Sequence, residues 1–213
     1  MHLLSVNVGQ ERPIRTARGT GRTGIYKLPV DHPVLVTDQG LAGDVISDTR
    51  HHGGADQAVY VYGARDYDWW FTRLGDPFSP GTFGENLTIG DLESSRFSIG
   101  DRLHVGAVIL EVTAPRIPCA TLAARMNDPA FVKTFRQAER PGFYCRVIRP
   151  GYVQAGDPVT VEPYTGETVT IIEMFRDYYA PDHREEAIRR YLNAPIAIRS
   201  RQEKEQALSE VLR

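Results

Sequence analysis

The segment from Ala107 to Leu122, AVILEVTAPRIPCATL, combines a strand, a turn and the start of a helix. Its first part is rich in branched aliphatic side chains, which favour a strand. Two prolines then interrupt the run, and a helical stretch follows at 120–126. The pattern predicts a strand-to-helix turn that contains Cys119, within a fold built on buried strands.

On both sides of this segment, short apolar runs alternate with turn residues as far as about Pro163. Glycine adopts positive φ easily and aspartate bonds its own backbone, so Gly-Asp pairs mark tight turns. The pairs are Gly43-Asp44, Gly90-Asp91, Gly100-Asp101 and Gly156-Asp157. Many short strands with such turns predict a mainly β fold, a barrel or a sandwich. Helical insertions are expected at 64–74, where Gly75 ends the run, and at 120–126 and 129–138.

From about Thr165 the apolar residues recur at helical spacings. Pro181 and Pro195 separate three such stretches, and Asp182 is expected to cap the second. We therefore expect residues 1–163 to form the β domain and residues 164–213 to form a three-helix C-terminal domain. Since the candidate site residues all precede Gly142, the tail is expected to be separable from the site.

The composition excludes several classes of protein. The 213 residues carry a formal net charge of −2 and no block of like charges, which argues against binding to nucleic acid or to an anionic membrane. Two cysteines do not make a disulfide framework. The first residues lack the features of a signal peptide, and no apolar run is long enough to span a bilayer, so we expect a cytoplasmic protein.

The densest group of polar and glycine residues is HHGGADQAVY, from His51 to Tyr60. Adjacent Gly53 and Gly54 allow a ligand to approach the backbone, whose amides can bind an anion. The neighbouring His52, Asp56 and Gln57 supply directed donors and acceptors. The alternative is an ordinary polar β-turn. A second glycine-containing loop, from Pro80 to Leu87, includes Glu85 and Asn86, which suit either ligand binding or the capping of a strand end.

Cys119 is the candidate reactive group. A position before a helix and the nearby Arg116 both favour the thiolate, which is a nucleophile and a ligand for soft metals. The alternative is a buried, inert cysteine. Cys145 lies in an apolar run and is expected to be a core residue. A zinc site made of His51, His52 and Cys119 has no supporting ligand spacing. Common nucleotide-binding and hydrolase motifs do not occur.

Taken together, these segments resemble the MOSC domain family, named for the C-terminal domain of molybdenum cofactor sulfurase, and in particular its bacterial YiiM-like group. They occur in the family's order over nearly the whole chain, and the three-helix tail is a feature of the same group. The segments are Thr23–Val30, Gly40–Asp44, His51–Tyr60, Phe83–Leu87, Gly100-Asp101, Pro115–Cys119, Arg140–Tyr144 and Gly156-Asp157.

The resemblance implies a β-barrel that binds molybdopterin, with Cys119 coordinating molybdenum. It also implies an oxidoreductase that reduces N-hydroxylated compounds, such as hydroxylaminopurine bases, to amines. The cofactor-binding residues carried over are His52, Gly53, Gly54, Asp56, Gln57, Lys27 and Arg116. Asp56 or Asn86 would deliver protons to the leaving oxygen.

The partners implied are a small N-hydroxylated substrate and a separate electron-donor protein of reductase, flavodoxin or ferredoxin type, because the chain has no flavin, haem or iron–sulfur motif. A homodimer is left open. The alternative function is a non-redox carrier of the molybdenum cofactor, or of sulfur on Cys119.

Overall fold

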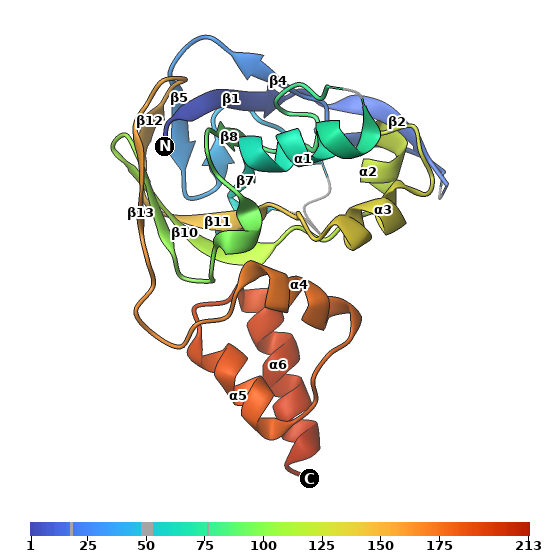
Figure 1. Ribbon diagram of the computed structural model, residues 1–213, viewed down its shortest axis with the longest axis vertical. Coiled ribbons are helices and arrows are strands. Elements are labelled where there is room, and N and C mark those ends of the chain that lie inside the picture. The colour runs from blue at the N-terminus through green and yellow to red at the C-terminus, as the bar shows by residue number, and fades with distance from the viewer. Residues whose placement is uncertain (18, 48–52, 76) are drawn as a thin grey trace.

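The computed structural model describes residues 1–17, 19–47, 53–75 and 77–213 (Figure 1). Its centre is an eight-stranded sheet with strand order β13-β9-β10-β11-β7-β8-β1-β4. The pairing of β7 with β8 is parallel, and the other pairings in this order are antiparallel. The strands are β1 (Leu3–Gly9), β4 (Lys27–Val30), β7 (Val59–Gly63), β8 (Leu87–Ile89), β9 (Arg102–Val105), β10 (Val108–Pro115), β11 (Phe143–Arg149) and β13 (Val159–Glu162).

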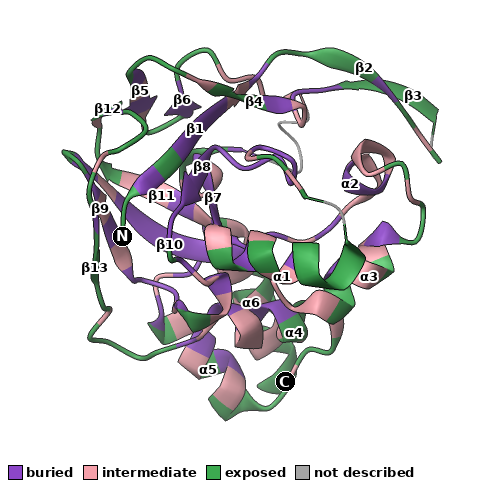
Figure 2. Ribbon diagram, turned by 45° about the horizontal axis from the view of Figure 1, so that its top comes forward, coloured by how far each residue is buried: buried purple, intermediate pink, exposed green. Residues whose placement is uncertain are grey.

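Smaller elements surround this sheet. A three-stranded sheet pairs β12 (Gly151–Val153), β5 (Val34–Thr37) and β6 (Gly40–Leu41), and β2 (Arg12–Thr16) forms a hairpin with β3 (Gly19–Thr23). Figure 2 shows the hairpin projecting, largely exposed, from the body of the molecule. The helices in the first part of the chain are η1 (Ala55–Gln57), α1 (Ala64–Leu74), η2 (Ser94–Arg96), α2 (Ala120–Arg125) and α3 (Phe131–Ala138). The helical insertions predicted from the sequence are confirmed.

The expected mainly β barrel is not confirmed. About 32% of the described residues are in strands and 31% in helices, so the architecture is a mixed sheet with helices, and no closed barrel is found among them. The start of β1 does approach the other edge of the sheet: Leu3 N donates to Asp157 O at 2.9 Å, and His2 forms an isolated bridge with Pro158. Turn-rich sequence indicates many strands, but closure depends on long-range pairing that local patterns do not specify.

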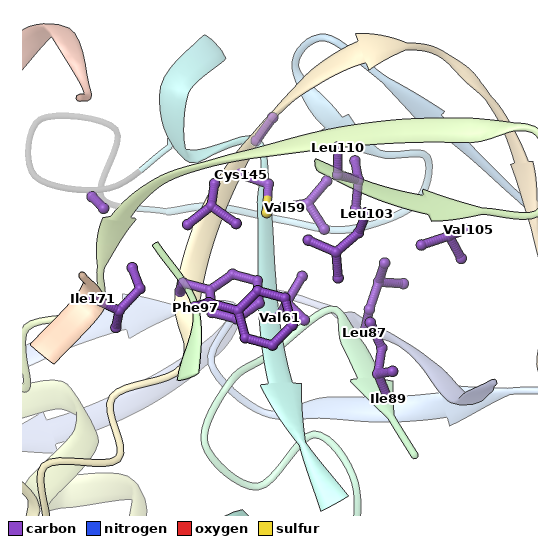
Figure 3. Packing of buried hydrophobic residues seen from close by; sticks show 14 of the residues in the cluster. Val59, Val61, Leu87, Ile89, Phe97, Leu103, Val105, Leu110, Cys145 and Ile171 are labelled. Carbon is purple, nitrogen blue, oxygen red and sulfur yellow. The ribbon is translucent and has the colours of Figure 1, made fainter. Parts of the chain in front are cut away.

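The main hydrophobic core lies on one face of the central sheet. Figure 3 shows Val59, Val61 and Leu87 packed with Leu103 and Leu110, all fully buried. Cys145 lies among them with no exposed surface, so the prediction that it is a core residue is confirmed. Burial of these aliphatic side chains stabilises the sheet, at roughly 1.5–3 kcal/mol for each fully buried one.

The C-terminal helices α4 (Ile171–Tyr179), α5 (Glu185–Asn193) and α6 (Ile198–Val211) gather at one end of the molecule (Figure 1). The same core cluster continues into them through Ile171, Met174 and Tyr191. Backbone hydrogen bonds also cross the boundary: Ile171 N donates to Phe97 O at 2.9 Å, and Ala197 N donates to Thr113 O at 3.1 Å. The tail is thus packed on the sheet, and its separation as a domain at 163/164 stays a prediction.

The ends of the tail helices differ in part from expectation. Thr170 and Glu173 form a capping box at the start of α4, a cap that was not among the predictions. The second helix begins at Glu185 with Arg184 in the capping position, so the predicted cap at Asp182 is wrong. Asp182 instead pairs with the side chain of Arg184. No helix among the described residues is both long and apolar enough to cross a membrane.

Candidate functional site

Cys119 lies in the turn between β10 and α2, as the sequence predicts. It occupies the position before the first residue of α2 in an extended conformation, with φ −130° and ψ 173°, and its carbonyl accepts a hydrogen bond from Ala123 N. The two prolines of the turn keep residues 115–118 out of the helix. The Cys119 side chain is half-buried, in contrast to that of Cys145, and lines the wall of a cavity.

This cavity has a volume of about 1080 Å³, which is large for a ligand site. One wall comes from the first part of the chain, and the other from the tail. The first wall includes Arg15, Gln57, Pro115, Ile117, Cys119, Asn127, Asp128 and Tyr144, and the second consists of Met174, Asp177, Tyr178, Tyr191, Arg199, Ser200, Glu203 and Lys204. The prediction that the tail is separable from the site did not include this second wall, and separability stays a prediction.

Arg116 is a buried cation next to the cavity. It is 4% exposed, and its guanidinium carbon lies 5.5 Å from the ring centre of Tyr60 and 5.8 Å from that of Phe135. Burial alone would lower the pKa of Arg116, but the neighbouring Tyr60, Tyr144 and Cys119 raise it, so the guanidinium stays charged. Its Nη1 has no hydrogen-bond partner among the described residues. A buried donor in this state is costly unless something else binds it.

Tyr144 connects this cation to the cavity. Its phenol accepts a hydrogen bond from Arg116, and burial raises its pKa, so the hydroxyl remains protonated. The Tyr144 side chain lines the cavity, and a negative charge on Cys119 adds to the rise in its pKa. No local pattern in the sequence singles out Tyr144, although it lies in the Arg140–Tyr144 segment that carries part of the family resemblance.

The glycine pair directly precedes η1, and Gln57 is the last residue of that helix. Gly53 and Gly54 have φ of 75° and 82°, a region that favours glycine, and Gly54 O accepts a hydrogen bond from Gln57 N at 2.9 Å. Gln57 lines the cavity, and its side-chain oxygen is buried without a partner among the described residues. His51 and His52, also singled out in the sequence, lie outside the described residues.

Asp56 points into the junction between the two parts of the chain and does not line the cavity. Its carboxylate lies 2.9 Å from Arg146 Nε and accepts a 2.6 Å hydrogen bond from Ile198 N, the first residue of α6. Arg146 in turn donates to the carbonyl oxygens of Pro195 and Ile196. The Asp56 side chain therefore fixes the start of α6 on η1.

Lys27 and Asn86 meet in a second buried cluster, around Asp44. Lys27 forms an ion pair with Asp44, whose carboxylate also accepts from Asn86 Nδ2 at 2.9 Å and from Gly9 N at 2.7 Å. Burial lowers the pKa of Lys27, and Asp44 opposes this shift. Asn86 also accepts a hydrogen bond from Tyr60 N at 3.1 Å. Neither Lys27 nor Asn86 lines the cavity.

Glu85 lies beside this cluster and is completely buried. One carboxyl oxygen accepts hydrogen bonds from the Tyr67 hydroxyl at 2.5 Å, Gly81 N at 2.7 Å and the Thr88 hydroxyl at 2.8 Å. Burial raises the pKa of Glu85, and these donors only partly offset the shift. Its contacts hold the loop against the start of β8, in line with the structural role that the sequence left open.

The site therefore offers one thiol together with directed polar groups, not a cluster of metal ligands. Among the residues that the structure describes, no group of three or more His, Cys, Asp or Glu side chains is arranged to hold a metal ion. Cys119 lines the cavity wall, and its thiol belongs to the class of groups that bind soft metals.

Comparison with known proteins identifies relatives over most of the chain. Residues 48–160 match the MOSC domain. The chain is 35% identical over 154 residues to the uncharacterized protein YflK of Bacillus subtilis, covering 72% of this chain and 70% of YflK. It is 33% identical over 168 residues to a protein of Gibberella moniliformis named "Reductase", which covers 76% of this chain but 30% of that longer protein.

The fold is also similar to a solved structure. The crystal structure of YiiM from Geobacillus stearothermophilus superimposes with a TM-score of 0.78 and 29% sequence identity, covering 96% of this chain and 97% of that one. The similarity therefore includes the helical tail as well as the sheet.

Proposed function

The chain belongs to the MOSC domain family, and from this premise we propose that it is a molybdenum-cofactor-dependent reductase that converts N-hydroxylated compounds, such as hydroxylaminopurine bases, to amines. The observation that carries the proposal is the position of Cys119 in a large cavity beside a buried cation and an amide oxygen that has no partner among the described residues. The relative named "Reductase" agrees with redox chemistry in this family.

The residues present fit such a cofactor. Molybdopterin has a polar pterin ring and an anionic phosphate. Gln57 and Arg116 each have a buried polar atom without a partner among the described residues, and these atoms suit the polar ring. Arg15 and Arg199 line the cavity, and neither forms an ion pair within the described chain, so they are candidates to bind the phosphate.

The roles of the chain's own residues follow from this placement. Cys119, as the thiolate, would coordinate molybdenum, and the charged Arg116 beside it favours the thiolate. Gly53 and Gly54 allow close backbone approach, and His52 remains a proposed contact. When bound, the cofactor supplies two-electron redox chemistry at its metal.

Reduction of R–NHOH consumes two electrons and two protons, breaks the N–O bond and gives R–NH₂ and water. The electrons would come from a separate donor protein of reductase, flavodoxin or ferredoxin type. Proton delivery by Asp56 or Asn86 stays a prediction. Both side chains already have partners outside the cavity, so a contribution from either one requires intervening water. In this proposal Lys27 pairs with Asp44, which binds Asn86, and so supports the loop from Pro80 to Leu87.

The test is elemental analysis of the purified protein for molybdenum, with pterin fluorescence measured after acid oxidation. Protein from a host that cannot make the cofactor is the control. We expect both molybdenum and pterin fluorescence. We also expect the protein to reduce 6-hydroxylaminopurine when a chemical electron donor is supplied. Cofactor without turnover would favour the carrier function, and absence of both molybdenum and pterin would contradict the proposal.

A further inference from the structure

The tail wall of the cavity contains one large aromatic side chain that is not buried. Tyr178, on α4, is 59% exposed and lines the cavity, whereas Tyr191 on the same wall is 6% exposed. An aromatic ring with so much exposed surface inside a cavity leaves apolar area in contact with solvent. A flat ligand could bury this area.

Tyr178 is nevertheless held in orientation. Its ring meets that of Tyr179 edge to face, with centres 5.1 Å apart and an angle of 87° between the planes. Tyr179 packs edge to face on Phe175, and the guanidinium carbon of Arg136 lies 4.0 Å from its ring centre. Since Tyr179 is fixed on two sides, its contact orients the ring of Tyr178, and more than half of the Tyr178 side chain stays exposed.

The groups around Tyr178 suit a flat molecule with a polar rim. Ser200, Glu203 and Asn127 line the same cavity and provide both donors and acceptors. Lys204 and Asp177 pair with each other at 2.5 Å, so the wall near the ring presents a neutralised ion pair and little net charge. This combination fits a neutral heteroaromatic base better than an aliphatic or strongly charged compound.

We propose that Tyr178 is the stacking residue of the substrate site, through which the tail selects planar heteroaromatic N-hydroxylated compounds over aliphatic ones. The reaction in this statement rests on the proposed function, but the stacking of a base on Tyr178 does not. The first wall, with Cys119, would serve the cofactor, as would Arg199 on the tail wall, and the part of the tail wall around Tyr178 would serve the substrate.

The test compares Tyr178→Ala and Tyr178→Phe with Tyr152→Ala in the full chain. Tyr152, on β12, is a matched control because it is 63% exposed and does not line the cavity. Binding of adenine, a flat base without the N–O bond, is measured by calorimetry for each protein. Turnover of 6-hydroxylaminopurine and of N-hydroxyurea is measured with a chemical electron donor.

We expect Tyr178→Ala to bind adenine about tenfold more weakly, which corresponds to about 1.4 kcal/mol. Its KM for 6-hydroxylaminopurine should rise similarly, with little change for N-hydroxyurea. Tyr178→Phe keeps the ring and should behave like the unmodified protein, as should Tyr152→Ala. Molybdopterin content should be equal in all of them.

Unchanged adenine binding in Tyr178→Ala, or an equal loss in Tyr178→Phe or Tyr152→Ala, would overturn the stacking role, and so would absence of adenine binding to the unmodified protein. The two proposals fail separately. A protein without molybdenum or turnover disproves the reductase function, while the calorimetric comparison still decides the role of Tyr178.

Discussion

The carboxylate of Asp56 accepts a 2.6 Å hydrogen bond from the backbone amide of Ile198, a residue 142 positions further along the chain. Asp56 belongs to η1, next to Gln57 in one wall of the cavity, and Ile198 begins α6, which carries part of the other wall. A negative charge at this end of a helix is also favourable electrostatically. The distance between the two walls therefore depends on this contact.

Replacing Asp56 with Ala should loosen the tail. The change removes a hydrogen bond to α6 and leaves Arg146 with one carboxylate, Glu111, so we expect a loss of about 2 kcal/mol in the free energy of unfolding. Hydrogen exchange at the first amides of α6 should become faster. Asp31→Ala, at an exposed turn position, is the control. Unchanged stability and exchange would show that the other contacts of the tail suffice.

The two cysteines should respond oppositely to substitution. Cys119→Ala should abolish reduction of 6-hydroxylaminopurine, and Cys119→Ser, with a harder oxygen ligand, should be much less active while it keeps some pterin. Burial raises the pKa of Cys145 well above its ordinary value, so this thiol remains protonated. Cys145→Ala should lose about 1 kcal/mol of stability and retain turnover. The reverse result in folded proteins would show that Cys119 is not the metal ligand.

Lys27→Met should destabilise the protein by about 3–5 kcal/mol, because it leaves the buried carboxylate of Asp44 without its cation. The double variant Lys27→Met with Asp44→Asn removes both charges and should recover part of this loss. Urea unfolding measures both effects. If Lys27 acts only as a support, pterin content per folded molecule should stay near that of the unmodified protein. A specific loss of pterin would instead indicate direct contact with the cofactor.

Glu85 should make stability depend on pH. Because burial raises its pKa above the ordinary 4.5, the folded state holds the proton more tightly than the unfolded state does. This contribution is fully present below the ordinary value and is lost as the pH rises through the raised pKa. Glu85→Gln has no titrating group there, so its stability relative to the unmodified protein should improve as the pH increases from about 4.5. Urea midpoints over a pH series test this, and a constant difference would contradict it.

Local features of the chain were predicted from the sequence because their causes are local. Gly75 ends α1 with φ of 81° and donates to Phe71 O at 2.8 Å, as a glycine after a helical run predicts. The turn at Cys119 follows from prolines that lie within four residues of it. Both outcomes depend on the conformational preferences of neighbouring residues.

The partners of the polar residues could not be predicted in the same way. Asp44 was predicted to be a turn residue, with no partner assigned to its side chain, yet it joins Lys27 and Asn86 in one buried cluster. Asp56 was expected at the cofactor but is engaged with α6. Tyr144 and Tyr178 reach the cavity from distant elements. These contacts arise from packing between segments that are remote in sequence, and single-residue patterns contain no information about them.

The hydrogen bonds that join Leu3 to residues 156 and 157 can form only after the ribosome has synthesised those residues. A ribosome adds about 5–20 residues per second, so the start of β1 waits roughly 10–30 s before these partners have been made. During that time the strand edge is unpaired and can associate with other nascent chains. Protection by a chaperone, or slower production at low temperature, should therefore raise the yield of folded protein more than it would for a chain whose first strand pairs only with its neighbours.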